Sequence, residues 1–475
     1  MSEENEMNKM GVEPVRKLLM TMGLPMIISM ALQALYNIVD SYFVSCMKDT
    51  AEISNMGDYG VNALTLAFPV QMLMVAIGVG TGVGINAIMS RSLGEGDRER
   101  GSRIAGNSVF LSLCTFVVFF LFGIFGVKAY IHSQTTNPVI LEMGTDYLRI
   151  CSVWSIGITL YIAYEKLLQA TGRTMLCTIA QITGAVVNII LDPIFIFGYF
   201  GLPQMGIRGA AYATVVGQCV TALTDAVFHY KFNKSDIDTD FKYIKPNGKI
   251  ILDIYKVGIP AILMQALMSF MTYGVNLIFG TVSEAAVTAY GVYYKIQQFV
   301  FFAAFGMNNA MIPVIAFNYG MGSRQRVNDG IRYGMWYTLI IMLAGALGLQ
   351  AFAGQITGVF AVSQETTLLC IRAIRVITLG YLFVGANIAY QGIFQALGHG
   401  VYSLIVSLLR LLVVALPVAW ALAKWNPDVM WAAFPFAEFV ACIVAVLMMR
   451  YIRRTQISTL LDTVVQTAVA EPRRV

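Results

Sequence analysis

Two carboxylates lie in sequence contexts that suit a bound cation. Asp40 ends the run LQALYNIVD, in which Tyr36 and Asn37 lie on or near the same helix face, and Asn188 and Asp192 stand four residues apart in NIILDP. The proline after Asp192 removes a backbone donor and frees a carbonyl in the preceding turn. Carboxylate oxygens, an amide oxygen and a freed backbone carbonyl are suitable ligands for Na⁺, and the carboxylates could also relay H⁺.

The composition predicts that these carboxylates lie inside a membrane. Of the 475 residues, 57% are hydrophobic and only 12% are charged, against about 25% charged in soluble domains. The mean hydropathy is +0.68. There is too little charge to cover soluble domains, which excludes a soluble enzyme, a nucleic-acid binder and a disordered scaffold. Helices fit better than a β-barrel, because barrel strands alternate apolar and polar residues.

Runs without Asp, Glu, Lys or Arg locate the membrane spans, since about 20 apolar residues cross a bilayer. The long runs are 18–39, 58–90, 104–127, 174–191, 257–283, 296–323, 333–364 and 376–409. The shorter runs are 150–164, 209–224, 411–423 and 429–437. Each of them is long enough to span the membrane only if one charged residue is tolerated inside or at the end of the helix. The predicted fold class is therefore all-α, a polytopic membrane protein with twelve transmembrane helices.

The distribution of Lys and Arg predicts the orientation, because these residues concentrate in cytoplasmic segments. With both termini inside, the outer segments hold only Lys48, Lys128, Arg208 and Lys424. We therefore expect a multi-pass protein of the cell membrane with both termini in the cytoplasm. This topology accounts for the net charge of +5 without a nucleic-acid partner.

The sequence repeats itself at a distance of 226 residues. GEGDRER (94–100) returns as GMGSRQR (320–326), and YEKLLQATG (164–172) returns as YQGIFQALG (390–398). Each half holds six predicted helices, so the halves share one orientation and form two pseudo-symmetric lobes, a transporter architecture. The predicted domains are a cytoplasmic N-terminal segment 1–16, an N-terminal lobe 17–232, a cytoplasmic linker 233–249, a C-terminal lobe 250–452 and a cytoplasmic tail 453–475.

The two carboxylates are expected at one depth in the first lobe. Counted from Arg16 and Arg173, both stand roughly 30 Å above the cytoplasmic side. Two carboxylates in a low-dielectric site should share a proton or a cation. The alternative is that the first merely ends a helix at the outer surface and the second caps a kink. The second lobe has no matching carboxylates, because the repeat places Asp40 near Val275 and the LDP motif near ALP (415–417). We therefore predict ion coupling in the N-terminal lobe only.

A third carboxylate lies lower in the same lobe. Glu165 stands about 12 Å from the cytoplasmic end. It either lines the cleft and attracts cationic substrates or forms a local ion pair with Lys166. Tyr36 and Asn37 are the other predicted substrate contacts.

Two further pairs of ionisable residues have structural explanations. Arg410 and Glu438 are predicted to pair inside the second lobe. Asp225 and His229 stand four residues apart near the cytoplasmic end of a helix and are predicted to be interfacial.

Several motifs in order resemble one family. They are GLPMII…LYNIVDSYFV, LGEGDRERG, YLRI, QATG, NIILDPIFIFG and GAAYATVVGQ, and together they resemble the multidrug and toxic compound extrusion (MATE) transporters. The resemblance implies a V-shaped, two-lobe antiporter that exports organic cations in exchange for Na⁺ or H⁺. In the bacterial branch with its acids in the first lobe, it also implies a cation site at Asp40, Asn188, Asp192 and Thr214, which would be the metal ligands under sodium coupling. Other branches place essential acids in helices seven and ten, but 257–283 and 376–397 contain none.

Other functions find less support. A lipid-linked oligosaccharide flippase of the same fold group is the main alternative, with Lys256, Lys295, Arg372 and Arg375 as candidate pyrophosphate ligands. The sequence has no HExxH, GxSxG or GxxxxGK[ST] motif, so we predict neither an enzyme nor an ATPase. No cofactor is expected beyond Na⁺ or H⁺ as the coupling ion. The expected partners are organic cations and the lipid bilayer, and the protein is expected to function as a monomer.

Overall fold

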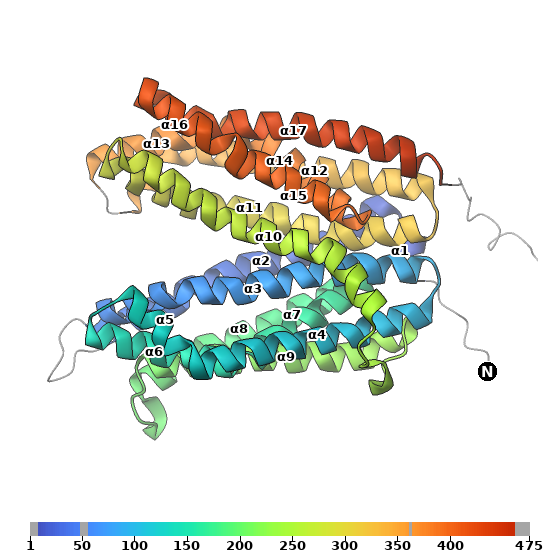
Figure 1. Ribbon diagram of the computed structural model, residues 1–475, viewed down its shortest axis with the longest axis horizontal. Helices are drawn as coiled ribbons and strands as arrows, with labels where there is room; N and C mark the ends of the chain where they lie inside the picture. The colour runs from blue at the N-terminus through green and yellow to red at the C-terminus, as the bar shows by residue number, and fades with distance from the viewer. Residues whose placement is uncertain (1–7, 48–55, 361–362, 461–475) are drawn as a thin grey trace, which may run out of the picture. The chain divides into compact units, whose positions relative to one another are not determined.

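The computed structural model describes residues 8–47, 56–360 and 363–460, without the side chains of residues 34 and 36–38. These described residues form helices and no strand (Figure 1). The α-helices are α1 (Lys9–Val12), α2 (Val15–Ser45), α3 (Met56–Gly94), α4 (Arg98–Phe125), α5 (Val127–Gln134), α6 (Pro138–Val153), α7 (Ile156–Ala170), α8 (Thr174–Phe197), α9 (Ile207–Phe232), α10 (Gly248–Gly280), α11 (Glu284–Gly320), α12 (Arg324–Gly358), α13 (Gln364–Ile377), α14 (Tyr381–Ala396), α15 (Gly400–Leu408), α16 (Ala415–Trp425) and α17 (Ala433–Ile452). The short 3₁₀ and π segments are η1 (Tyr199–Gly201), η2 (Asn233–Ser235), η3 (Phe241–Tyr243), η4 (Thr378–Gly380), η5 (Leu409–Val413), η6 (Pro427–Ala432) and η7 (Arg453–Ile457).

The helices confirm the predicted all-α membrane fold. Within the described residues, eleven helices or helix runs are long and apolar enough to cross a bilayer. The pair α6 and α7 passes the same criterion together and is bent by 47°. The bend lies at Trp154, whose backbone (φ −101°, ψ 22°) leaves the helical region. Counted as one span, this pair is the twelfth.

The predicted internal repeat is also present in the backbone. The turn QATG ends at Gly172 with φ +82°, and its counterpart QALG ends at Gly398 with φ +83°. Side-chain bonds repeat as well: Sγ of Cys177 donates to the carbonyl of Glu165, as Oγ of Ser403, 226 residues later, donates to the carbonyl of Gln391. Positive φ favours glycine, which explains why glycine ends both turns.

The chain divides into two compact units. The N-terminal unit comprises Leu24–Asn86 and Ser102–Ala266, and the C-terminal unit comprises Met1–Gly23, Ala87–Gly101 and Leu267–Val475. The lobe boundaries expected from the repeat remain a prediction.

An apolar core and one ion pair hold the C-terminal unit together. Trp431 and Phe279 are buried, with ring centroids 4.9 Å apart. The predicted pair of Arg410 and Glu438 is confirmed: Nε of Arg410 donates to Oε1 of Glu438 at 2.8 Å, and both side chains are buried. Asn387 donates to the other carboxylate oxygen at 2.7 Å. These bonds compensate both charges within apolar surroundings.

The start of the described chain is fixed to the same unit. Arg326 on α12 donates to the backbone carbonyls of Met10 at 2.9 Å and Glu13 at 2.7 Å, and to the side chain of Asn318 at 2.6 Å. Part of the predicted N-terminal segment is therefore bound to α11 and α12. Residues 1–7 of that segment, and 461–475 of the predicted tail, lie outside the described residues.

Candidate functional site

The four predicted cation-site residues come from three helices of the N-terminal unit. Asp40 lies on α2, Asn188 and Asp192 on α8, and Thr214 on α9. Asp192 is fully buried, Asp40 is 8% exposed, and the side chains of Asn188 and Thr214 are buried too. Asp40 also stands inside its helix, because α2 continues to Ser45. All four residues thus occupy the interior of the unit.

Two glycines allow α8 and α9 to approach closely at this site. A Cβ atom at Gly217 would lie 2.9 Å from both the Cβ of Asn188 and the carbonyl oxygen of Gly184. A Cβ atom at Gly184 would lie 2.6 Å from the carbonyl oxygen of Gly217. Both distances are shorter than van der Waals contact, so any larger residue would push the helices apart. Small residues serve this purpose between many membrane helices.

We expect Gly217→Ala to lower the free energy of unfolding by about 1–3 kcal/mol, because the added methyl group overpacks the α8–α9 contact. The measurement is thermal unfolding of the purified protein in detergent. Gly291→Ala in α11 is the matched control, since open space surrounds that glycine. Equal unfolding midpoints for the two variants would contradict the role assigned to Gly217.

The side-chain amide of Asn188 joins Asp192 to Thr214. With its nitrogen directed to Oδ2 of Asp192, at 3.3 Å, its oxygen accepts a hydrogen bond from the backbone N–H of Thr214 at 3.1 Å. Oγ1 of Thr214 and Oδ1 of Asp40 have no hydrogen-bond partner. The site therefore contains buried oxygen atoms whose bonding capacity is unused.

The charge arrangement suits one cation or one shared proton. The carboxylates of Asp40 and Asp192 are close enough to interact electrostatically, so two negative charges would repel each other. No group of three or more His, Cys, Asp or Glu residues with metal-binding geometry occurs in the described part of the chain. Carboxylate, amide and hydroxyl oxygens are ligands of hard cations rather than of transition metals.

A cavity of about 80 Å³ lies inside the N-terminal unit beside these residues. Its polar lining consists of Gln33, Tyr161, Gln181, Asn188, Thr214, Gln218 and Thr221. This volume can hold several water molecules, and it is far below the roughly 300–1,000 Å³ of a drug-sized site. In this conformation the cavity suits water and small ions. Most of these lining residues were not predicted from the sequence, because neutral polar side chains do not interrupt an apolar run as charged residues do.

Glu165 is buried and is paired locally. Its carboxylate lies 3.7 Å from the ammonium of Lys166 and accepts a hydrogen bond from the amide of Gln169. The ammonium also donates to Gln169 at 3.0 Å. The ion pair that was the alternative to a substrate contact is thus present. Tyr161, one turn earlier on α7, lines the cavity.

Two other predictions have different outcomes. The side chains of Tyr36 and Asn37, predicted substrate contacts, lie outside the described residues. Asp225 and His229, predicted to be interfacial, are both buried inside the protein, Asp225 completely and His229 with 3% exposed. Their depth in the bilayer stays a prediction. The rule that ionisable residues within a span are functional would have identified Asp225.

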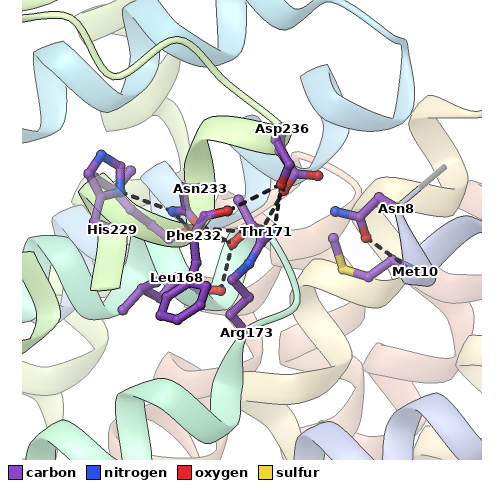
Figure 2. Close-up of polar contacts among 11 residues, drawn as sticks. Asn8, Met10, Leu168, Thr171, Arg173, His229, Phe232, Asn233 and Asp236 are labelled. Carbon is purple, nitrogen blue, oxygen red and sulfur yellow. Dashed lines mark hydrogen bonds and ion pairs between the residues drawn. The ribbon is translucent and has the colours of Figure 1, made fainter. Parts of the chain in front are cut away.

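A polar cluster closes the C-terminal end of α9 (Figure 2). Oδ1 of Asn233 accepts hydrogen bonds from Thr171 at 2.9 Å and from Arg173 at 3.2 Å. Its amide nitrogen lies 3.0 Å from Nδ1 of His229, and Arg173 pairs with Asp236 at 2.6 Å. Figure 2 shows Asn233 between His229 and Arg173. The cluster ties the start of α8 to the end of α9, at the side of the unit predicted to face the cytoplasm.

The sequence profile of the MatE family matches residues 25–194 and 260–421, which is more than half of the chain. The chain belongs to the MatE family. The match covers both carboxylates of the site, Asp40 and Asp192.

Curated relatives of this MatE protein are multidrug exporters. The chain is 26% identical over 442 residues to the multidrug export protein MepA of Staphylococcus aureus (strain bovine RF122 / ET3-1), covering 93% of this chain and 94% of that protein. It is also 26% identical over 443 residues to MepA of Staphylococcus saprophyticus, covering 92% and 94% of the two chains. The relatives match nearly the whole chain, so no large part of it is unique.

Solved structures of MATE transporters share the fold. A MOP superfamily transporter from Pyrococcus furiosus, described as having a binding pocket of reverse polarity, superposes with a TM-score of 0.86 at 25% identity. The superposition covers 96% of this chain and 98% of that one. An outward-facing multidrug resistance MATE transporter gives the same TM-score, identity and coverage. Together with the spans, these likenesses establish a multi-pass membrane transporter fold.

Proposed function

We propose that this MatE protein is a secondary antiporter that exports organic cations, including drugs, in exchange for Na⁺ or H⁺. The buried site of Asp40, Asn188, Asp192 and Thr214 carries the proposal. Asn188 contacts both Asp192 and Thr214, and Asp40 lies within electrostatic range of Asp192. Buried oxygens of Asp40 and Thr214 have no hydrogen-bond partner. The family and the names of the relatives support export of drugs.

The proposed cycle is alternating access of the two lobes. Open to the outside, the acids Asp40 and Asp192 bind Na⁺ or H⁺, which favours release of the exported cation. Open to the cytoplasm, the coupling ion leaves and an organic cation binds. Exchange follows when each ligand has a different affinity for the two conformations. The proposal places the protein in the cell membrane as a monomer with both termini in the cytoplasm.

Glu165, Tyr36 and Asn37 are the proposed substrate contacts. Glu165 is paired with Lys166 at 3.7 Å, so a cationic substrate would replace the ammonium at the carboxylate. Such replacement keeps the buried carboxylate compensated throughout, which avoids the cost of an unpaired buried charge.

The flippase alternative is less consistent with the contacts of its candidate ligands. Lys256 donates to Asp253 at 2.9 Å, and Arg372 forms an ion pair with Asp428. The side chains of Lys256 and Arg372 are therefore each paired with a carboxylate of the same unit, which makes them less suited to bind a pyrophosphate.

The function is tested with purified protein in liposomes that contain ethidium. Na⁺ and H⁺ gradients are imposed separately, and dye movement is compared with that of protein-free liposomes. We expect one gradient to drive dye movement and thereby to identify the coupling ion. If neither gradient moves dye in folded protein, the export proposal fails, and flipping of a labelled lipid-linked sugar becomes the next assay.

A further inference from the structure

Asp225 is a buried carboxylate that no part of the proposed mechanism uses. It lies on α9, one turn beyond Thr221, which lines the cavity. Its side chain is fully buried, and neither carboxylate oxygen has a hydrogen-bond partner. A charged carboxylate in such a place would have no protein hydrogen-bond donor to stabilise it.

The ionisable neighbours of Asp225 supply no compensating cation. Glu165 and Tyr161 on α7 and Cys177 on α8 lie within electrostatic range. The ammonium of Lys166, on α7, is engaged by Glu165 at 3.7 Å and by Gln169 at 3.0 Å.

The neighbours on the other side of Asp225 are engaged as well. His229, one turn further along α9, has its Nδ1 at 3.0 Å from the amide nitrogen of Asn233. The guanidinium of Arg173 bonds to Asn233 and Asp236 (Figure 2). An uncompensated buried carboxylate is very costly, whereas the neutral acid is not, so this environment stabilises the protonated form.

The cavity extends from Asn188 and Thr214 of the cation site to Thr221, one helical turn before this acid. Its lining runs from Gln181 to Asn188 along α8 and from Thr214 to Thr221 along α9. Asn188 contacts Asp192 at one end of these stretches, and Thr221 precedes Asp225 by one turn at the other. Several water molecules fit the volume, and hydrogen-bonded water carries protons.

We propose that Asp225 is a second proton-binding site of the N-terminal unit, through which protons pass between the Asp40–Asp192 pair and the cytoplasmic side. In the transfer step the O–H bond of the Asp225 carboxylic acid breaks and the proton moves to a water molecule that enters from the cavity. The water becomes hydronium, and Asp225 becomes a carboxylate. The reverse step, from hydronium to Asp225, restores the acid. The binding site stands on its own, whereas its place in the cycle rests on the proposed antiport.

Infrared spectroscopy of the purified full-length protein tests the binding site. The carbonyl band of protonated carboxylic acids is followed as the pH is raised, in the wild type and in Asp225→Asn. We expect the variant to lack the absorption of one carboxylic acid, and Asp225→Glu to restore it at a shifted frequency. Asp240→Asn, at a carboxylate whose side chain is 61% exposed, is the matched control and should leave the band unchanged. Superimposable spectra of wild type and a folded Asp225→Asn protein would overturn the proposal.

Transport in liposomes tests the place of Asp225 in the cycle. Asp225→Asn is expected to lose ethidium movement driven by a H⁺ gradient but to keep exchange of ethidium against ethidium, which requires no net proton release. Full H⁺-driven transport in this variant, or a wild type driven by Na⁺ alone, would overturn the relay role. A wild type that moves no ethidium in either assay would instead refute the antiport proposal, and the infrared result would still decide whether Asp225 binds a proton.

Discussion

Replacing Glu438 by alanine is expected to lower the free energy of unfolding by about 3–5 kcal/mol, because the change leaves a buried arginine without its counter-charge. Arg410 is 7% exposed and donates to Oε1 of Glu438 through Nε at 2.8 Å and Nη2 at 2.7 Å. Asn387 would lose its carboxylate acceptor and keep only the backbone carbonyl of residue 438. Few single substitutions in the C-terminal unit should cost as much stability.

Two controls separate loss of the ion pair from the general effect of removing a carboxylate. The double variant Arg410→Met/Glu438→Leu removes both charges, and we expect it to be nearly as stable as the wild type or more stable. Glu142→Ala removes a carboxylate whose side chain is 75% exposed and should leave the unfolding midpoint unchanged. Thermal unfolding in detergent decides the matter. A double variant less stable than Glu438→Ala would contradict this account of the pair.

Asp192→Asn is expected to reduce gradient-driven export to the level of protein-free liposomes. The substitution nearly preserves shape but removes the charge that a Na⁺ ion needs and the group that accepts a proton. The amide nitrogen of Asn188, 3.3 Å from Oδ2 of Asp192, can still donate to the oxygen of the new amide, so the fold should be retained. Initial rates of ethidium movement are measured under the gradient that drives the wild type.

Glu142→Gln is the matched control for this loss of transport, since it removes an exposed carboxylate of the same unit. Its transport rate should equal that of the wild type. An Asp192→Asn protein that folds and transports at the wild-type rate would remove the basis for placing the coupling ion at this site.

The sequence predicted the fold well because its signals are local. Charge-free runs of span length and the repeat of glycine turns depend only on nearby residues, and the structure has both, down to φ angles of +82° at Gly172 and +83° at Gly398. The NIILDP spacing likewise placed Asn188 and Asp192 on one face of α8.

The interior of each unit could not be predicted in the same way, because it depends on contacts between helices. The repeat places Gly184 and Tyr161, which line the cavity, at the positions of Arg410 and Asn387 in the second half. In the C-terminal unit Arg410 forms a buried ion pair with Glu438, which also accepts a hydrogen bond from Asn387. In the N-terminal unit the glycine has no side chain, and α8 and α9 pack closely together beside the cavity. The sequence repeat does not show that the same helix arrangement encloses a filled core in the C-terminal unit and a polar cavity in the N-terminal unit.

Asp225 illustrates the limit of counting along the chain. Its distance from the end of a span predicted its depth, but not that it would be completely buried on α9, which packs against α7 and α8. The pairing of Glu165 with Lys166 was foreseen only as one of two alternatives, because adjacent residues on a helix do not normally face each other.

The proposed exchange of an exported cation for a coupling ion bound at Asp40 and Asp192 can be tested directly. In the most direct test, ethidium drives the ion instead of the reverse. An ethidium gradient is imposed on proteoliposomes without an ion gradient, and the uptake or release of radioactive Na⁺ and the change in internal pH are recorded. The account predicts that ethidium drives one of these ions in the opposite direction in the wild type, and that Asp192→Asn abolishes this countermovement. Ethidium flux through the wild type with no opposing movement of either ion would contradict it.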